Sequence, residues 1–129
     1  MNILLDTHIF FWAVSQTGLL NLTKKEKAII TDIEHSIYVS NISLFEMSIK
    51  HTKGKWQQVD KILNNYSNII EAHQFKETGF TGEMAISAGK YTQQHSDPFD
   101  CMIAAQVKHN DFTLITRDKI FSKLNIKCL

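Results

Sequence analysis

The amino-acid sequence predicts an α/β fold with a central parallel sheet, because short apolar runs alternate with segments of helical periodicity. At 129 residues and 43% hydrophobic composition, the chain is long enough and apolar enough to bury one core. No linker, repeat or low-complexity stretch divides it, so we expect a single domain over residues 1–129. The expected strands are Ile3–Leu5, Ile37–Val39, Ile69–Glu71, Phe112–Ile115 and a weaker run at Ile126–Cys128.

Three helices are expected in the first half of the chain. The first of them, His8–Ser15, is short and aromatic. Thr23 is a suitable N-cap for a second helix that reaches Glu34. Ser43 and Glu46 have the spacing of a capping box, which predicts a third helix over Ser43–Lys53.

Three more helices are expected in the second half. Apolar residues recur at helical spacing over Val59–Asn68, just before the third expected strand. The same spacing predicts a helix over Glu83–Gln93. Pro98 stands at a favoured first helical position and predicts a helix over Pro98–Lys108, which leads to the fourth strand.

Four acidic residues from distant parts of the chain stand where this fold would bring their carboxylates together: Asp6, Glu46, Asp100 and Asp118. Asp6 and Asp118 follow apolar runs, and open parallel sheets bind ligands beyond the carboxyl ends of their strands. Converging carboxylates repel one another unless a divalent cation lies between them. Because the donors are hard oxygens and no His/Cys cluster favours zinc, the ion would be Mg²⁺ or Mn²⁺. The pattern therefore predicts a metal-dependent enzyme that hydrolyses a phosphodiester.

Each of these acids also has a simpler interpretation as a helix cap. Asp97 could be the N-cap of the helix that begins at Pro98, with Asp100 in the acidic position of a capping box. The helical face of Asp100 argues for a site, because Ile103 and Ala104 share that face and should point to the core. An acid held at the inner edge of a helix N-terminus is also kept ionised by the helix dipole.

With these residues in place, the chain resembles the PIN-domain nuclease family, in particular the VapC-like toxins of bacterial toxin–antitoxin pairs. Four segments carry the resemblance, in the order and spacing of that family, and together they span essentially the whole chain: Leu4–His8, Asn41–Lys50, His95–Gln106 and Leu114–Asp118. The third segment is the most specific of the four.

The resemblance implies a three-layer α/β/α PIN-like fold and a Mg²⁺- or Mn²⁺-dependent endoribonuclease. It further implies that Asp6, Glu46 and Asp100 are the acidic triad, that Asp118 is the fourth acid and that Asp97 matches an additional acid of the family. It implies RNA as substrate, a homodimer, and a cognate antitoxin that blocks the acidic pocket.

Three further residues near the acids each have two alternative roles. Lys50 could contact a phosphate, or it could form an i,i+4 ion pair with Glu46. Thr116 could orient Asp118 or a water molecule, or it could bond only to backbone. Arg117 could hold a phosphate, or it could be an exposed side chain; exposure is favoured.

Composition limits the partners. The net charge is +1, so RNA contact would depend on a local patch rather than on a basic field over the whole molecule. No apolar run reaches membrane-spanning length and no signal peptide is evident, so we expect a cytoplasmic protein without a membrane partner. The aromatic segment Phe10–Trp12 and the helix Thr23–Glu34 have more apolar surface than one small sheet covers, which suits a dimer or an antitoxin contact.

Two alternative functions remain at this stage. One is a housekeeping RNA-processing nuclease of the same fold that has no antitoxin. The other is a phospho-acceptor signalling module, which would need paired acids near the first strands, whereas Asp6 stands alone.

Overall fold

The structure, a computed structural model that describes residues 1–129, contains a four-stranded parallel sheet with strand order β3-β2-β1-β4. The strands are β1 (Asn2–Leu5), β2 (Ser36–Ser40), β3 (Lys76–Thr78) and β4 (Thr113–Ile115). Ile3 of β1 pairs with Ile37 of β2 and with Thr113 of β4. The chain therefore builds β2 and β3 on one side of β1 and β4 on the other, and the strand order reverses between β1 and β4.

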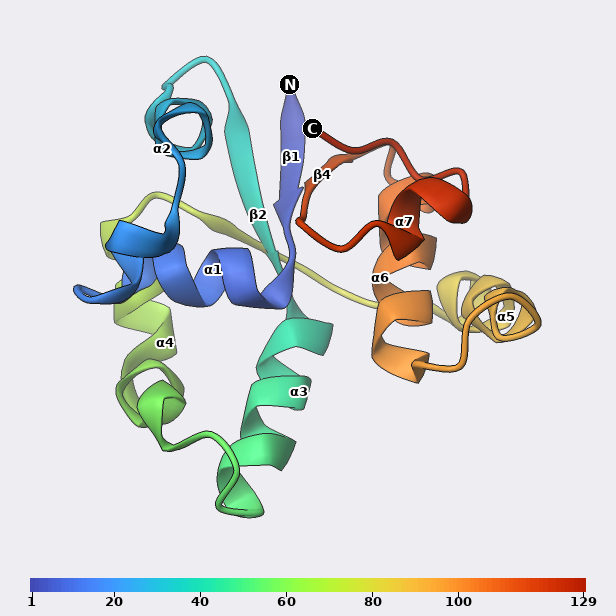
Figure 1. Cartoon of the computed structure of the whole chain (residues 1–129), viewed down its shortest axis with the longest axis horizontal. Coiled ribbons are helices and arrows are strands. Elements are labelled where there is room, and N and C mark those ends of the chain that lie inside the picture. The colour runs from blue at the N-terminus through green and yellow to red at the C-terminus, as the bar shows by residue number, and fades with distance from the viewer.

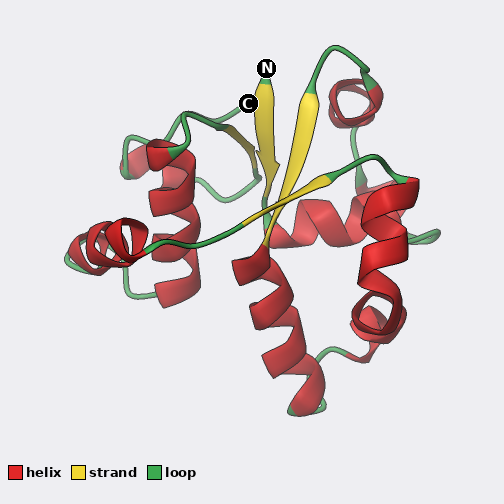
Figure 2. Cartoon of the chain, turned by 180° about the vertical axis from the view of Figure 1, so that it is seen from behind, coloured by secondary structure: helices red, strands yellow, loops and turns green.

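Helices lie on both faces of this sheet, as Figures 1 and 2 show. The helices are α1 (Thr7–Val14), α2 (Lys24–Thr31), α3 (Asn41–Thr52), α4 (Asp60–Ala72), α5 (Gly82–Tyr91), α6 (Pro98–His109) and α7 (Ile120–Lys123), with 3₁₀ turns η1 (Gly18–Asn21) and η2 (Gln57–Val59). In Figure 1, α1, α2 and α4 lie to one side of the strands and α5, α6 and α7 to the other. The predicted three-layer α/β/α arrangement is confirmed.

Alternating residues of β1 separate the two halves of the core, because successive side chains of a strand point to opposite faces. Ile3 and Leu5 pack with Phe10 of α1 in one apolar cluster. Leu4 packs with Ile103 of α6 in the other. All five side chains are almost completely buried, so the sheet is covered on both faces. None of the helices has the length and apolar character needed to span a membrane.

Most of the expected elements form close to their expected positions, and the helix over Val59–Asn68 is longer than expected. The expected strand Ile69–Glu71 is wrong, because these residues belong to α4. Asn65 makes a kink in that helix, and Ile62 before it and Ile69 after it pack in the same apolar cluster. The third strand is Lys76–Thr78, an edge strand without an apolar residue.

Two other boundaries differ from expectation. The third helix begins at Asn41 rather than Ser43, with Ser40 as its N-cap, because the Ser40 hydroxyl accepts a hydrogen bond of 3.0 Å from the backbone N–H of Ile42. The weak run Ile126–Cys128 makes one isolated bridge to Leu114 instead of a strand.

Candidate active site

The four predicted acids line one hollow of about 410 Å³ at the carboxyl ends of β1 and β4. This is the point where the strand order reverses, which is where open parallel sheets bind their ligands. Asp97, Lys50 and Arg117, which the sequence also singled out, line the same hollow. We call it the acidic pocket.

Asp6 is fixed by contacts to two neighbouring segments. Its Oδ1 accepts a hydrogen bond of 2.8 Å from the backbone N–H of Thr7, so Asp6 is the N-cap of α1. Its Oδ2 accepts one of 2.6 Å from the Thr116 hydroxyl. Burial raises the pKa of Asp6, and these two hydrogen bonds oppose that rise by stabilising the carboxylate. Asp6 therefore both caps α1 and lines the acidic pocket.

Glu46 reaches the acidic pocket from the second turn of α3, not from the first turn as expected. Its Oε1 accepts a hydrogen bond of 3.0 Å from the Thr7 hydroxyl, which also lies 2.8 Å from the buried Ser43 hydroxyl. Its Oε2 is 3.0 Å from the Lys50 ammonium, so the predicted i,i+4 ion pair is present. Ser43 is thus bonded to Thr7 and is not part of a capping box.

Asp100 lies in the first turn of α6, on the face whose next residues are buried, as expected. Its Oδ2 lies 2.8 Å from Nε2 of His95. Burial raises the pKa of Asp100 to about 6, and the nearby carboxylates of Asp97 and Asp6 add to this rise. A raised pKa means that the folded chain disfavours the charged form of this carboxyl group when no cation is present.

Asp97 is the N-cap of α6, as predicted. Its Oδ1 accepts hydrogen bonds from the backbone N–H groups of Phe99, at 2.9 Å, and Asp100, at 3.4 Å. One carboxylate oxygen of Asp97 is therefore committed to the helix, and the side chain still lines the acidic pocket.

Thr116 connects the first and last acids of the chain. Its hydroxyl donates to Asp6 and accepts a hydrogen bond of 3.0 Å from the backbone N–H of Asp118. Asp118 in turn accepts a hydrogen bond of 3.0 Å from the N–H of Ile120, which begins α7. Thr116 therefore has the contacts that a positioning role requires. The N-cap position of α7 is Lys119, so Asp118 bonds the first turn of that helix from one residue before its cap.

Arg117 is exposed, as favoured, but its guanidinium is not free. It forms two bonds to the Glu26 carboxylate, at 2.5 and 3.2 Å, and also donates to the backbone carbonyl of Asn21. The group lies 4.6 Å from the centre of the Trp12 ring. These contacts join the segment after β4 to α2, so a phosphate would have to compete with a bidentate ion pair.

The donor chemistry of the acidic pocket fits a divalent cation. Its carboxylates come from four separate segments, and burial raises the pKa of Asp6 and Asp100. Among them, Glu46 alone is paired with a lysine. A hard divalent cation would stabilise the charged carboxylates, because it would supply positive charge that the neighbouring side chains provide only beside Glu46.

Three contact residues of the site were missed by sequence reasoning or assigned another role. Thr7 and Ser43 form the hydroxyl pair beneath Glu46, and both lie within the segments that resemble family motifs. For His95 the sequence allows two interpretations, a contact that supports the carboxylates or a structural role, and the second is commoner for a lone histidine. Its place five residues before Asp100, beside a helix N-terminus, was the available signal.

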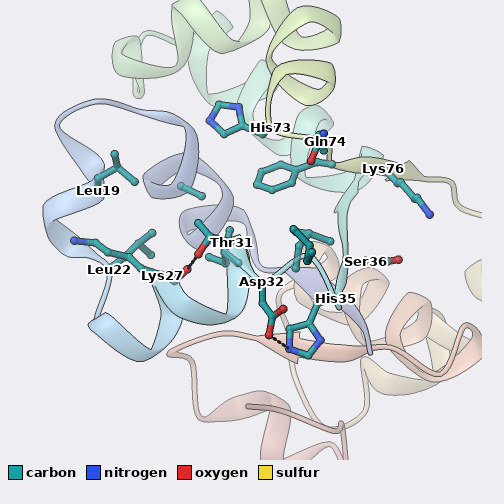
Figure 3. A pocket seen from close by; sticks show the side chains of 15 residues that line it. Leu19, Leu22, Lys27, Thr31, Asp32, His35, Ser36, His73, Gln74 and Lys76 are labelled. Atoms are coloured by element: carbon teal, nitrogen blue, oxygen red, sulfur yellow. Dashed lines mark hydrogen bonds and ion pairs between the residues drawn. The ribbon is translucent and has the colours of Figure 1, made fainter.

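A second hollow lies at the opposite end of the strands. It has a volume of about 450 Å³ and lies between α1, α2 and the first residues of β2 and β3. Its lining includes Leu19, Leu22, Ile30, Ile37 and Phe75, and Figure 3 shows Lys27, His73 and Lys76 at its border. We call it the apolar groove.

Comparisons with known proteins agree on the fold. The family model described as PIN domain matches residues 3–127. No curated protein matches significantly. The structure of VapBC2 from Rickettsia felis bound to a DNA fragment from their promoter is similar at a TM-score of 0.67 and 19% identity, covering 100% of this chain and 98% of that chain.

Two further solved structures have the same fold. FitAcB from Neisseria gonorrhoeae matches at a TM-score of 0.60 and 20% identity, over 98% of this chain and 96% of that chain. A toxin–antitoxin complex from Klebsiella pneumoniae matches at a TM-score of 0.53 and 19% identity, over 91% and 87% of the two chains.

Proposed function

Because the chain belongs to the PIN domain family, we propose that it is a Mg²⁺- or Mn²⁺-dependent endoribonuclease that acts as the toxin of a toxin–antitoxin pair. The observation that carries the proposal is the acidic pocket, whose lining at the switch point of the sheet includes Asp6, Glu46, Asp100 and Asp118. No other group of side chains around this pocket has the arrangement of an activated nucleophile.

Asp6, Asp100, Glu46 and Asp118 are the proposed metal ligands. When bound, the cation supplies Lewis-acid assistance to phosphodiester hydrolysis. Thr116 and Thr7 hold Asp6 and Glu46 in place through hydrogen bonds of 2.6 and 3.0 Å. Lys50 lines the pocket beside Glu46 and keeps one cationic group where an RNA phosphate would approach.

The toxin assignment draws on the similar structures, which are described as VapBC2, FitAcB and a toxin–antitoxin complex. The apolar groove is the surface of this chain that best suits an antitoxin, because its floor is apolar and its border carries Lys27 and Lys76. An amphipathic segment with acidic residues would match both features. A homodimer remains part of the proposal.

RNA-end mapping after induction of the native chain and of Asp6→Asn tests the nuclease. We expect new RNA ends only with the native chain, and only when Mg²⁺ or Mn²⁺ is supplied to the purified protein. Cleavage in excess chelator would contradict metal dependence. Ca²⁺ should bind without supporting much turnover.

Co-expression with the neighbouring reading frame tests the toxin assignment. We expect a small protein to co-purify with the chain and to suppress its cleavage of RNA. A chain that cleaves RNA and co-purifies with nothing would instead be the housekeeping nuclease.

A further inference from the structure

His95 is the histidine whose ring nitrogen lies within hydrogen-bond distance of a carboxylate of the proposed metal site. Its Nε2 lies 2.8 Å from Oδ2 of Asp100. One donor atom each from His95, Asp97 and Asp100 lie within 4.8 Å of one another. In an octahedral site with bonds of about 2.1 Å, ligand atoms lie about 3 to 4.2 Å apart, so small side-chain movements would bring all three to one ion.

The backbone of His95 is fixed on both sides. Its N–H donates to the Tyr91 carbonyl at 3.1 Å, at the end of α5. Its carbonyl accepts from the Cys101 thiol of α6 at 3.4 Å. The imidazole side chain is only 22% exposed, and its Nε2 contacts the carboxylate of Asp100. The ring is therefore held beside the carboxylates instead of reaching them from a free loop.

Imidazole nitrogen and carboxylate oxygen make different demands on a metal ion. Mg²⁺ takes oxygen ligands almost alone and keeps several waters. Among first-row transition ions, imidazole suits Zn²⁺, Cu²⁺, Fe²⁺ and Ni²⁺, whereas carboxylates suit Mg²⁺ and Mn²⁺. Of the two ions that carboxylates suit, Mn²⁺ is the transition metal and accepts an imidazole more readily than Mg²⁺ does. A single nitrogen among carboxylates should therefore raise the affinity for Mn²⁺ more than the affinity for Mg²⁺.

We infer that His95 is a nitrogen ligand of the metal site, together with Asp97 and Asp100, and that it makes this site prefer Mn²⁺ over Mg²⁺. The inference rests on the proposed function for the presence of a metal, and it adds the identity of the ion and the residue that selects it. A purely positioning role would have His95 hold Asp100 by a hydrogen bond without contacting the ion.

Metal binding without RNA separates these two roles. Purified native chain, His95→Ala and His95→Gln are titrated with Mn²⁺ and with Mg²⁺ by calorimetry at one pH, and the Mn²⁺ complexes are measured by pulsed electron paramagnetic resonance. Glutamine retains a hydrogen-bond donor for Asp100 and has no imidazole nitrogen. His8→Ala is the matched control, because the His8 ring lines the acidic pocket and stacks on Trp56.

We expect histidine nitrogen coupling to Mn²⁺ in the native chain and in His8→Ala, and its loss in both His95 variants. The dissociation constant for Mn²⁺ should rise about tenfold or more in both His95 variants, with little change for Mg²⁺. Nitrogen coupling that is absent from the native chain, or that disappears in His8→Ala alone, would overturn the inference. Native Mn²⁺ affinity in His95→Gln would overturn it as well.

Failure of this inference is distinct from failure of the proposed function. If the native chain binds Mn²⁺ and Mg²⁺ but shows no nitrogen coupling, His95 is not a ligand and the metal-dependent nuclease still stands. If the native chain binds neither ion, the inference and the proposed metal dependence both fail.

Discussion

The two ends of the parallel strands carry hollows of similar size and opposite chemistry. The acidic pocket at the carboxyl ends has a volume of about 410 Å³ and two hydrophobic residues among the eleven that line it. The apolar groove at the amino ends has a volume of about 450 Å³ and seven hydrophobic residues among fifteen. The first is suited to an ion and a polar substrate, and the second to an apolar segment of another molecule. One small sheet therefore separates a site for chemistry from a surface for binding.

The difference follows from how each hollow is assembled. At the carboxyl ends, Asp6 is the N-cap of α1 directly after β1, and Asp97 is the N-cap of α6 after α5, so two capping carboxylates line the same pocket with helix dipoles behind them. At the amino ends, apolar side chains that line the groove remain exposed, such as Leu19 at 42% and Ile33 at 89%. The acidic pocket is charged because helix caps lie there, and the apolar groove is apolar because the fold leaves these side chains uncovered at that end.

The largest effect should come from removing a carboxylate of the acidic pocket. Asp6→Asn and Asp100→Asn should each lower the rate of RNA cleavage by at least about a hundredfold. Loss of a residue that only hydrogen-bonds a metal ligand costs about 10–100-fold, and loss of the ligand itself should cost at least as much. Neither should unfold the chain, since both substitutions remove a charge that burial disfavours. Cleavage rates and thermal unfolding of the purified variants measure both effects.

The control for this test is Asp60→Asn, which removes an acid of α4 that is 56% exposed and outside the acidic pocket. It should cleave RNA at the native rate. If Asp6→Asn and Asp100→Asn also cleave at the native rate, the acidic pocket is a structural feature and the contrast between the two hollows loses its functional meaning.

The second largest effect should separate binding from chemistry. Leu19 lines the apolar groove and is 42% exposed, so Leu19→Asp would place an unpaired charge against an apolar partner. We expect loss of co-purification with the product of the neighbouring frame and unchanged RNA cleavage by the isolated chain. Pull-down and cleavage assays measure the two outcomes.

Leu20→Asp is the matched control for Leu19→Asp. Leu20 is the next residue, is 87% exposed and does not line the apolar groove. It should retain the partner. Retention of the partner by Leu19→Asp would remove the apolar groove from the proposed antitoxin surface.

These two regions also differ in how far the sequence predicts them. Asp6, directly after a buried run, and Asp118, three residues beyond the end of another, were predictable because an acid just past a buried run is a local signal. His95 and the Thr7–Ser43 pair were not, because their contacts join segments that meet only in the folded chain. The apolar groove had a local signal only in the apolar surface of Thr23–Glu34, which supplies one side of its lining.

The third strand illustrates the same limit. Lys76–Thr78 contains no apolar residue, so nothing in its composition marks a strand, and it is held by pairing with β2 at the edge of the sheet. The short apolar run Ile69–Glu71 fits the period of a strand as well as that of a helix. It is helical because it continues α4, in which Ile69 packs against the same apolar cluster as Ile62.

A smaller effect is expected from the support of the acidic pocket. Thr116→Val removes the hydroxyl that bonds Asp6 at 2.6 Å and accepts from the backbone of Asp118. Cleavage should fall about tenfold, the range for groups that orient metal ligands. Thr116→Ser keeps the hydroxyl and should retain most activity. Equal losses in both variants would point to packing of the methyl group instead.

The free energy of unfolding should depend on pH, because burial disfavours the charged form of the Asp100 carboxyl group in the acidic pocket. Burial raises the pKa of Asp100 from 3.8 to about 6, so within that window the folded chain keeps a proton that the unfolded chain has released. The free energy of unfolding should therefore fall as pH rises through this window when no metal is present. In Asp100→Asn this contribution is absent.

Urea unfolding in a chelator, at about pH 4.5 and about pH 7, measures this contribution. The stability of Asp100→Asn relative to the native chain should increase between the two pH values. A difference that stays constant with pH would mean that Asp100 is not disfavoured as a charge in the folded state.

The smallest effect concerns Arg117, which lines the acidic pocket while its guanidinium is bonded elsewhere. Arg117→Gln should lower the free energy of unfolding by about 0.5–1 kcal/mol, because the pair with Glu26 is largely at the surface. RNA cleavage should keep its native rate and KM. Glu26→Gln should also lower the free energy of unfolding, and the double variant should cost less than the sum of the two, because both changes remove the same ion pair. A raised KM in Arg117→Gln with native behaviour in Glu26→Gln would show instead that Arg117 leaves its partner to hold RNA, and would extend the acidic pocket to a phosphate-binding cation.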